Sequence, residues 1–215
     1  MRRKQFLQVG SGAIALFVFD RICQDAVRAQ EFLSVPPNSR REKVCSQVLT
    51  GQIDRIMRDG IASEVQLLRL LRINNAPLNL YGDLPNIYRE EAEIEGVNYD
   101  IAFCQMCLET GFLQFDGDVK PEQNNFGGIG ATGNGARGDS FSDRRIGVRA
   151  QIQHLKAYAT TKPLVLPLVD LRFSLIKRGT APLLSQLSGK WAEDVNYDKK
   201  IMSILRRLYE LSGFF

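Results

Sequence analysis

The stretch CQMCLETGFL (Cys104–Leu113) decides the fold, because it describes a helix that is uncharged except at its end. Glu109 is the only charged side chain in it. Asn98 can cap the start of this helix and Gly111 can stop it, so we expect a helix from about 99 to 110. Its residues are apolar on most sides, which indicates a buried helix.

The carboxyl group of Glu109 has two readings in these surroundings. Desolvation among apolar neighbours disfavours the charged form, so its pKa should rise and the group can hold a proton near neutral pH. Such an acid can protonate the leaving oxygen of a glycosidic bond, as hydrolysis of an acetal requires. The alternative is a helix-terminal Glu that is satisfied by a nearby Arg or by backbone donors. The position of Glu109 in the sequence does not decide between a catalytic acid and a structural glutamate.

The cysteines beside this carboxylate are expected to be packing residues. Cys104 and Cys107 lie three apart on an apolar helix, a spacing that suits small buried side chains. The chain has no second Cys/His pair at zinc spacing, and its single histidine, His154, is expected to be packed or hydrogen-bonded. We therefore predict no metal site and no cofactor, with a redox role for the two cysteines as a distant alternative.

Periodicity and turn residues outline the rest of the chain. Between 116 and 143 there are seven glycines and three asparagines, which exclude one long helix and predict short strands and loops. Further helices are expected within 43–74, where two are predicted, and at 87–95, 147–160, a short one ending at 187, and 197–211. The pattern predicts an α+β fold that is mainly α, with a small glycine-rich strand and loop lobe.

The first 29 residues have the features of a targeting segment. Three basic residues at positions 2 to 4 precede an uncharged, mainly apolar run that is too short to span a bilayer. Ala29 offers a cleavage site for an export signal. We expect export to the periplasm, cell envelope or extracellular space, with an uncleaved anchor, or a helical extension of a cytosolic protein, as alternatives.

Composition and charge indicate how the rest of the chain is divided and which partners are expected. Residues 30–42 are expected to be a linker, 43–76 a helical extension and 77–215 the main domain. Without the five basic and two acidic residues of the leader, the formal charge falls from +4 to +1. The basic balance therefore does not argue for nucleic acid or an anionic membrane as a partner, and we expect no stable membrane span after processing. Nothing here specifies an oligomeric state.

Two motifs and two flanking stretches carry a family resemblance. A helix with Gln-x-x-x-Glu-[Ser/Thr]-Gly (105–111) precedes Asn-Asn-Phe-x-Gly (124–128), and GVRAQIQHLKAY (147–158) and RGTAPLLSQLSGKWAEDVNYDKKI (178–201) follow. Over 87–204 the chain resembles the bacterial endo-β-N-acetylglucosaminidases of glycoside hydrolase family 73, which cut peptidoglycan. The resemblance implies a lysozyme-like catalytic domain over 77–215 and peptidoglycan glycan strands as the partner.

The resemblance also implies roles for single residues. Glu109 matches the general acid of the family, and Tyr197 matches a tyrosine thought to position the acetamido group of the substrate. Asn125 and Phe126 match residues that line the sugar cleft. The expected substrate-binding residues are Gln105, Asn125, Phe126, Gly128 and Trp191, of which Trp191 could stack on a sugar face, although a lone Trp is more often part of a core.

The second catalytic group is not marked by a motif. A second carboxylate would lie about 5 to 5.5 Å from the acid in a retaining enzyme and about 6.5 to 9.5 Å in an inverting one. Several relatives carry a Glu about thirty residues beyond the acid, and the nearest loop carboxylate here is Asp139. Substrate assistance is the alternative, in which the N-acetyl carbonyl is the nucleophile and Tyr197 aids it. Leu171 stands where the family pattern leads us to expect proline.

Three functions remain in competition. The first is hydrolysis of β-1,4 bonds at N-acetylglucosamine in peptidoglycan. The second is a lytic transglycosylase, which shares the architecture and the single acid but releases an anhydro-sugar. The third is a non-catalytic wall-binding module, which the missing second carboxylate would allow.

Overall fold

The computed structural model describes residues 53–131 and 137–211, which belong to one compact unit of the chain, 50–215. The expected leader, the linker and the first part of the extension lie outside the described residues. Within the described part, no helix is long and apolar enough to cross a membrane. The mainly helical class predicted from the sequence is confirmed, and the only β contacts among the described residues are the isolated bridges Arg55–Leu183 and Ser188–Ala192.

Helix α6 (Tyr99–Glu109) lies at the centre of the fold. Its N-terminus is capped as predicted, because the side chain of Asn98 accepts hydrogen bonds from the backbone N–H groups of Asp100 and Ile101. Residues 99–107 of the helix are all buried, including Cys104 and Cys107. Burial on every side agrees with the mainly apolar sequence of this helix, whose buried polar side chains include Asp100 and Gln105.

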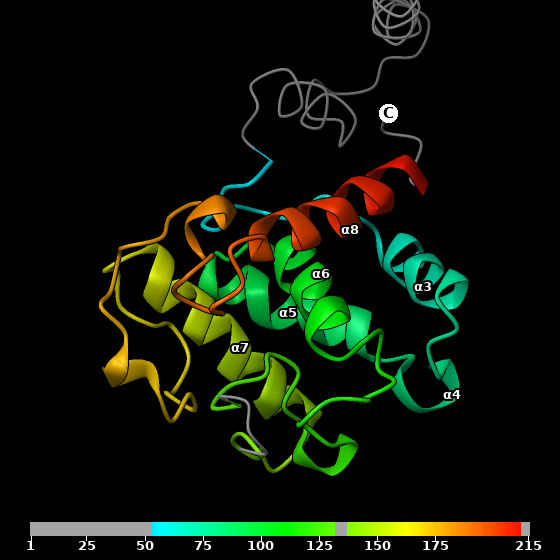
Figure 1. The fold of residues 1–215 in the computed structure, drawn as a ribbon, viewed down its shortest axis with the longest axis horizontal. Helices are drawn as coiled ribbons and strands as arrows, with labels where there is room; N and C mark the ends of the chain where they lie inside the picture. The colour runs from blue at the N-terminus through cyan, green and yellow to red at the C-terminus, as the bar shows by residue number, and fades with distance from the viewer. Residues whose placement is uncertain (1–52, 132–136, 212–215) are drawn as a thin grey trace, which may run out of the picture. The chain divides into compact units, whose positions relative to one another are not determined.

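Three long helices pack around α6, as Figure 1 shows. Helix α5 (Leu84–Glu95) precedes it and is capped at its C-terminus by Gly96, whose φ of 72° suits a glycine. Helix α7 (Arg144–Ala159) packs on both α5 and α6. Helix α8 (Tyr197–Leu211) begins and ends at the residues predicted, and its buried face, led by Tyr197 and Ile201, lies against α6.

The described part of the expected extension shares the core of this unit. Helix α3 (Glu64–Ile73) buries Leu67, Leu70 and Leu71 and packs against α8 and α5, and a short helix α4 (Leu78–Tyr81) follows it. Ahead of α3, the backbone N–H groups of Ile61 and Ala62 donate to the buried carboxylate of Asp100. Residue 76 is therefore no packing boundary. The first helix expected in the extension lies mostly outside the described residues, and 53–58 form a turn, the isolated bridge at Arg55 and a bend instead of its end.

The glycine-rich segment forms a lobe of loops after α6. Its described residues contain a 310 helix, η1 (Pro121–Gln123), and no strand, while 132–136 lie outside the described residues. Backbone hydrogen bonds close the lobe on itself, from Asp139 N to Ile129 O (2.8 Å) and from Phe141 N to Gln123 O (2.8 Å). Asp143 then caps α7 by accepting from the N–H of Ile146.

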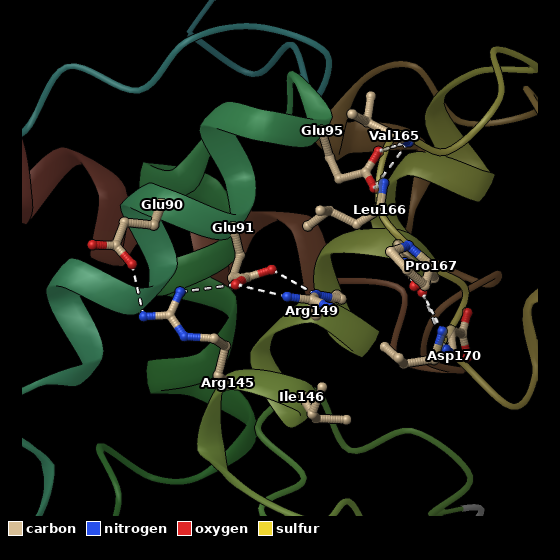
Figure 2. A network of polar contacts seen from close by, with 12 residues as sticks. Glu90, Glu91, Glu95, Arg145, Ile146, Arg149, Val165, Leu166, Pro167 and Asp170 are labelled. Atoms are coloured by element: carbon tan, nitrogen blue, oxygen red, sulfur yellow. Dashed lines mark hydrogen bonds and ion pairs between the residues drawn. The ribbon is translucent and has the colours of Figure 1, made fainter.

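Between α7 and α8 the chain is mostly irregular, with 310 helices η2 (Phe173–Leu175) and η3 (Leu184–Gln186). Buried side chains on α5 and α7 hold its first part in place, and Figure 2 shows Glu95 of α5 beside Val165 and Leu166. The carboxylate of Glu95 accepts from Val165 N and Leu166 N and pairs with Lys156 at 2.7 Å. Burial would raise the pKa of Glu95, but the hydrogen bonds from Lys156, Leu166 and Val165 outweigh it and hold that pKa below its ordinary value.

Ion pairs also join α5 to α7 directly, as Figure 2 shows. The buried Glu91 accepts from Arg149 Nε at 2.8 Å and from Arg145 Nη1 at 2.9 Å. Arg145 reaches Glu90 as well, at 2.7 Å. These contacts fix the register of the two helices, and thereby the side chains of α7 that face α6.

Candidate active site

Glu109 is the last residue of α6 and stays partly accessible, as does Leu108 before it, while residues 99–107 of the helix are buried. Burial raises its pKa to about 7, although hydrogen bonds from Tyr197 and Trp191 act to lower it. Close to neutral pH the group therefore exchanges its proton readily. The first of the two readings of this carboxylate, a desolvated acid, agrees with the geometry, since no Arg is among its partners in the described residues.

Tyr197, the first residue of α8, comes to this carboxylate from the far end of the sequence. Its hydroxyl donates a hydrogen bond to Glu109 Oε1 and accepts one from Gln105 Nε2 at 2.8 Å. The side chain is buried, with 4% of its surface exposed. Burial first, and then the neighbouring Glu109, raise its pKa well above the ordinary value, so it remains a neutral hydroxyl.

The glycine-rich lobe touches the site through two glycines that lie next to each other. A Cβ on Gly128 would lie 2.9 Å from Glu109 Oε2, and Gly128 has a φ of +63°. A Cβ on Gly127 would lie 2.8 Å from Cγ of Gln151 on α7. The lobe can approach α6 and α7 this closely only because both positions lack a side chain. Gly128, which was predicted to bind substrate, therefore lies directly beside the carboxyl group.

Asn125 and Phe126 were expected to line a sugar cleft, and the structure buries both of them. The amide of Asn125 ties the lobe together by donating to Ile129 O and Asp139 O and accepting from Ile129 N. Phe126 packs with Tyr81 and Phe115. Their contacts hold the lobe beside Glu109, and neither side chain is exposed to a ligand. Gln105 is likewise fully buried, where a substrate contact was expected.

Asp139, the candidate second carboxylate, is paired with Arg172 and not with Glu109. Its two oxygens accept from Arg172 Nε at 2.9 Å and Nη2 at 3.3 Å, which is a bidentate ion pair. The guanidinium of Arg172 also lies against Gly130, where a Cβ would be 2.5 Å from Nη2. The pair joins the lobe to the segment after α7. Among the described residues, no second carboxylate is a hydrogen-bond partner of Glu109.

Trp191 lies beside Glu109 and is partly exposed, so its ring can still meet a ligand. It stacks edge-on against His154 at 4.7 Å between ring centroids and also contacts Tyr158. His154 Nδ1 in turn lies 2.8 Å from the buried carboxylate of Asp170. His154 is hydrogen-bonded as expected, but the sequence did not identify Asp170 as its partner.

The support of the site also includes two residues that the sequence did not single out. Gln151 on α7 bonds to Gln105, and Tyr88 on α5 donates to Gln151. No local pattern marks them, because each contact crosses from one helix to another. A hollow does exist on the other side of α8, lined by residues that include Asp198, Met202 and Arg206, but Glu109 is not part of it.

Two comparisons with known proteins found matches for this chain. A family model described as Glucosaminidase, mannosyl-glycoprotein endo-beta-N-acetylglucosaminidase, matches residues 85–210. A protein of Borreliella burgdorferi (strain ATCC 35210 / DSM 4680 / CIP 102532 / B31), described as uncharacterized, is 52% identical over 135 residues. That alignment covers 63% of this chain and 66% of the other protein, just under two thirds. No solved structure matches. The matched region contains α6, the lobe, α7 and most of α8, and the chain belongs to the Glucosaminidase family.

Proposed function

We propose that this protein hydrolyses β-1,4 glycosidic bonds next to N-acetylglucosamine in the peptidoglycan glycan, with Glu109 as the general acid. One observation carries the proposal: a partly accessible carboxyl group at the end of a buried helix, with a pKa of about 7. A proton held there is available at neutral pH, which protonation of a leaving alkoxide requires. Membership of the Glucosaminidase family supports the same reaction class.

The first step follows from this geometry. Glu109 gives its proton to the bridging oxygen as the bond between that oxygen and the anomeric carbon breaks, and both bonding electrons stay on the oxygen. The carboxylate that results is stabilised by the hydroxyl of Tyr197 and by the indole N–H of Trp191. The oxygen of a water molecule then bonds to the anomeric carbon and the water gives a proton back to Glu109, which completes hydrolysis. We propose that the exposed part of the Trp191 ring stacks on a sugar face.

For the second group, we propose the N-acetyl carbonyl of the substrate in preference to Asp139. A carboxylate held by two hydrogen bonds from one guanidinium is a weaker nucleophile and base than a free one. Tyr197 was expected to position the acetamido group, but its proton is directed to Glu109 and its side chain is buried. We therefore propose that Tyr197 acts on the acid, not on the sugar.

The substrate sets the location and the partner. Peptidoglycan lies in the cell envelope, so we propose that the protein acts there, exported by its first 29 residues and bound to glycan strands. No role in nucleic-acid binding is proposed.

The test is a zymogram on purified peptidoglycan with wild-type protein, Glu109→Gln, and Glu93→Gln as a matched control on an exposed glutamate of α5. We expect clearing by wild type and by the control, and none by Glu109→Gln. Mass spectrometry of the soluble products then identifies the reaction. Reducing N-acetylglucosamine ends support hydrolysis, whereas anhydro-muramic ends would establish the transglycosylase. Clearing that survives in Glu109→Gln, or is absent from the wild type, would overturn the proposal.

A further inference from the structure

Four buried side chains, each from a different helix, form a chain of hydrogen bonds that ends on Glu109. Tyr88 of α5 donates to Gln151 Oε1, and Gln151 Nε2 of α7 donates to Gln105 Oε1 at 2.8 Å. Gln105 Nε2 of α6 donates to the hydroxyl of Tyr197 at 2.8 Å, and Tyr197 donates to Glu109 Oε1. All four are almost completely buried. We call this set of Tyr88, Gln151, Gln105 and Tyr197 the interior relay.

A backbone carbonyl fixes the direction of the interior relay. Gln151 Nε2 also donates to the carbonyl oxygen of Ala102 at 3.1 Å. A carbonyl can only accept, so this end of the Gln151 amide must be its NH₂ group. The other end is then the acceptor for Tyr88, and Gln105 must present its own oxygen to Gln151 and its NH₂ group to Tyr197. Every amide orientation follows from this one contact.

The direction of the hydrogen bonds in the interior relay determines which oxygen of Glu109 accepts the Tyr197 proton. Because the oxygen of Tyr197 already accepts from Gln105, its single proton is directed to Glu109 Oε1. An oxygen that accepts this hydrogen bond is disfavoured as the site of the acid proton. The proton of neutral Glu109 then resides on Oε2, the oxygen beside Gly128.

On the basis of the proposed function, we infer that Gln105 and Gln151 are positioning residues of the reaction: through Tyr197 they place the transferable proton of Glu109 on Oε2. Without Gln105, neutral Glu109 would be free to donate that proton to the oxygen of Tyr197, away from the sugar. Buried polar groups arranged in series reinforce one another, so the effect of one member reaches the end of the chain.

The surroundings of Glu109 contain few other groups that titrate. Tyr197 and Tyr88 lie in the interior relay, and burial raises the pKa of both well above the ordinary value. Burial likewise raises the pKa of the Cys104 and Cys107 thiols on α6. His154 and Asp170 stand behind Trp191, and Asp139 is paired with Arg172. A change in the titration of Glu109 on substitution of Gln105 is therefore assigned to the relay.

The decisive variant is Gln105→Met, which keeps the length of the side chain and removes both hydrogen bonds. The pKa of Glu109 is measured without substrate, from the ¹³C carboxyl signal of labelled glutamate, assigned with Glu109→Gln. Loss of the bond from Gln105 makes Tyr197 a weaker donor to the carboxylate and a better acceptor from the acid. Both changes favour the protonated form, so we expect the pKa to rise by about 0.5 to 1 unit. We also expect kcat/KM to fall about tenfold and the alkaline limb of its pH profile to move upward.

A double-mutant cycle separates positioning from general damage. In a Tyr197→Phe background, Gln105→Met should leave the pKa of Glu109 unchanged, because Gln105 acts only through the Tyr197 hydroxyl. Tyr99→Phe is the matched control, since it removes another buried hydroxyl, bonded to Ala62 O at 3.0 Å, outside the relay. It should lower the melting temperature without moving the titration of Glu109.

A second variant guards against misfolding of the first. Gln151→Met leaves Gln105 free to turn its amide over, so it should shift the pKa of Glu109 in the same direction by a smaller amount. The inference is overturned if folded Gln105→Met and Gln151→Met both titrate like wild type, or if Gln105→Met shifts the pKa equally without the Tyr197 hydroxyl. Because the titration needs no substrate, a relay that behaves as expected in a protein without glycan activity would refute the proposed function alone.

Discussion

A Cβ atom on Gly128 would lie 2.9 Å from Oε2 of Glu109, so the glycine-rich lobe meets the acid at a position without a side chain. Burial raises the pKa of this carboxyl group to about 7, and the lobe is one of the elements packed against it. The close approach of Gly128 leaves Oε2 facing the lobe while Oε1 faces Tyr197. The two oxygens of the acid therefore have different surroundings.

We predict that Gly128→Ala impairs catalysis more than it impairs folding. The φ of +63° costs an alanine about 1 to 2 kcal/mol, and the methyl group must also displace Oε2 or the lobe. Gly96→Ala is the control, because its φ is +72° but its nearest neighbour would be Met57 Cε at 3.8 Å, an ordinary contact. Gly128→Ala should lose at least as much stability as Gly96→Ala in urea unfolding, and only Gly128→Ala should lose tenfold or more in kcat/KM. Equal activity of the two would contradict the contact.

The raised pKa of Glu109 predicts that Glu109→Gln changes the pH dependence of stability. The folded protein holds this proton up to about pH 7, whereas a glutamate of ordinary pKa, 4.5, releases it earlier. Between these values the native state binds more protons than the unfolded state, so stability falls as pH rises through the window. A difference of this size corresponds to about 3 kcal/mol as an upper estimate.

The measurement for this prediction is urea unfolding at pH 4 and at pH 8. Wild type and the exposed Glu93→Gln control should lose up to about 3 kcal/mol of stability between pH 4 and pH 8, and Glu109→Gln should not. The variant that lacks the acid would then be relatively more stable at pH 8. If all three proteins change in parallel, Glu109 titrates like an exposed carboxylate and the desolvation argument fails.

The sequence predicted the elements that depend on neighbours along the chain. Helix α6, its Asn98 cap and the start of α8 at Tyr197 all follow from local patterns, and they lie where expected. The support of Glu109 could not be predicted in this way. Gln105 meets Tyr197 and Gln151 across separations of 92 and 46 residues, which only tertiary packing sets.

Motif membership alone also misplaced some side chains. Gln105, Asn125 and Phe126 were expected to contact substrate because they stand in the two motifs, yet all three are buried. They hold the acid and the lobe in place through buried hydrogen bonds and ring contacts. Asp170 was missed for a different reason, since its link to the site passes through His154 and Trp191.

The ion pair of Asp139 with Arg172 predicts a mild effect of Asp139→Asn. The substitution removes a charge but keeps an oxygen that can accept one bond from Arg172, so the lobe should stay in place. We expect kcat/KM to fall less than tenfold, against a hundredfold or more for a catalytic carboxylate. Assays on purified peptidoglycan, with folding checked by circular dichroism, decide the matter. A loss above a hundredfold in a folded variant would make Asp139 the second catalytic group and refute substrate assistance.

The buried pair of Glu95 with Lys156 predicts the largest loss of stability from a single conservative change. Glu95→Gln leaves the Lys156 ammonium, 3% exposed, without its counter-charge, at a cost of about 3 to 5 kcal/mol. The double variant Glu95→Gln with Lys156→Met removes both charges and should recover part of this loss in urea unfolding. Because the hydrogen bonds that hold Glu95 keep its pKa below its ordinary value, its stabilising effect is present above that value and is lost as pH falls through the lowered pKa. Single and double variants of equal stability would show that the pair is not the anchor of residues 165 and 166.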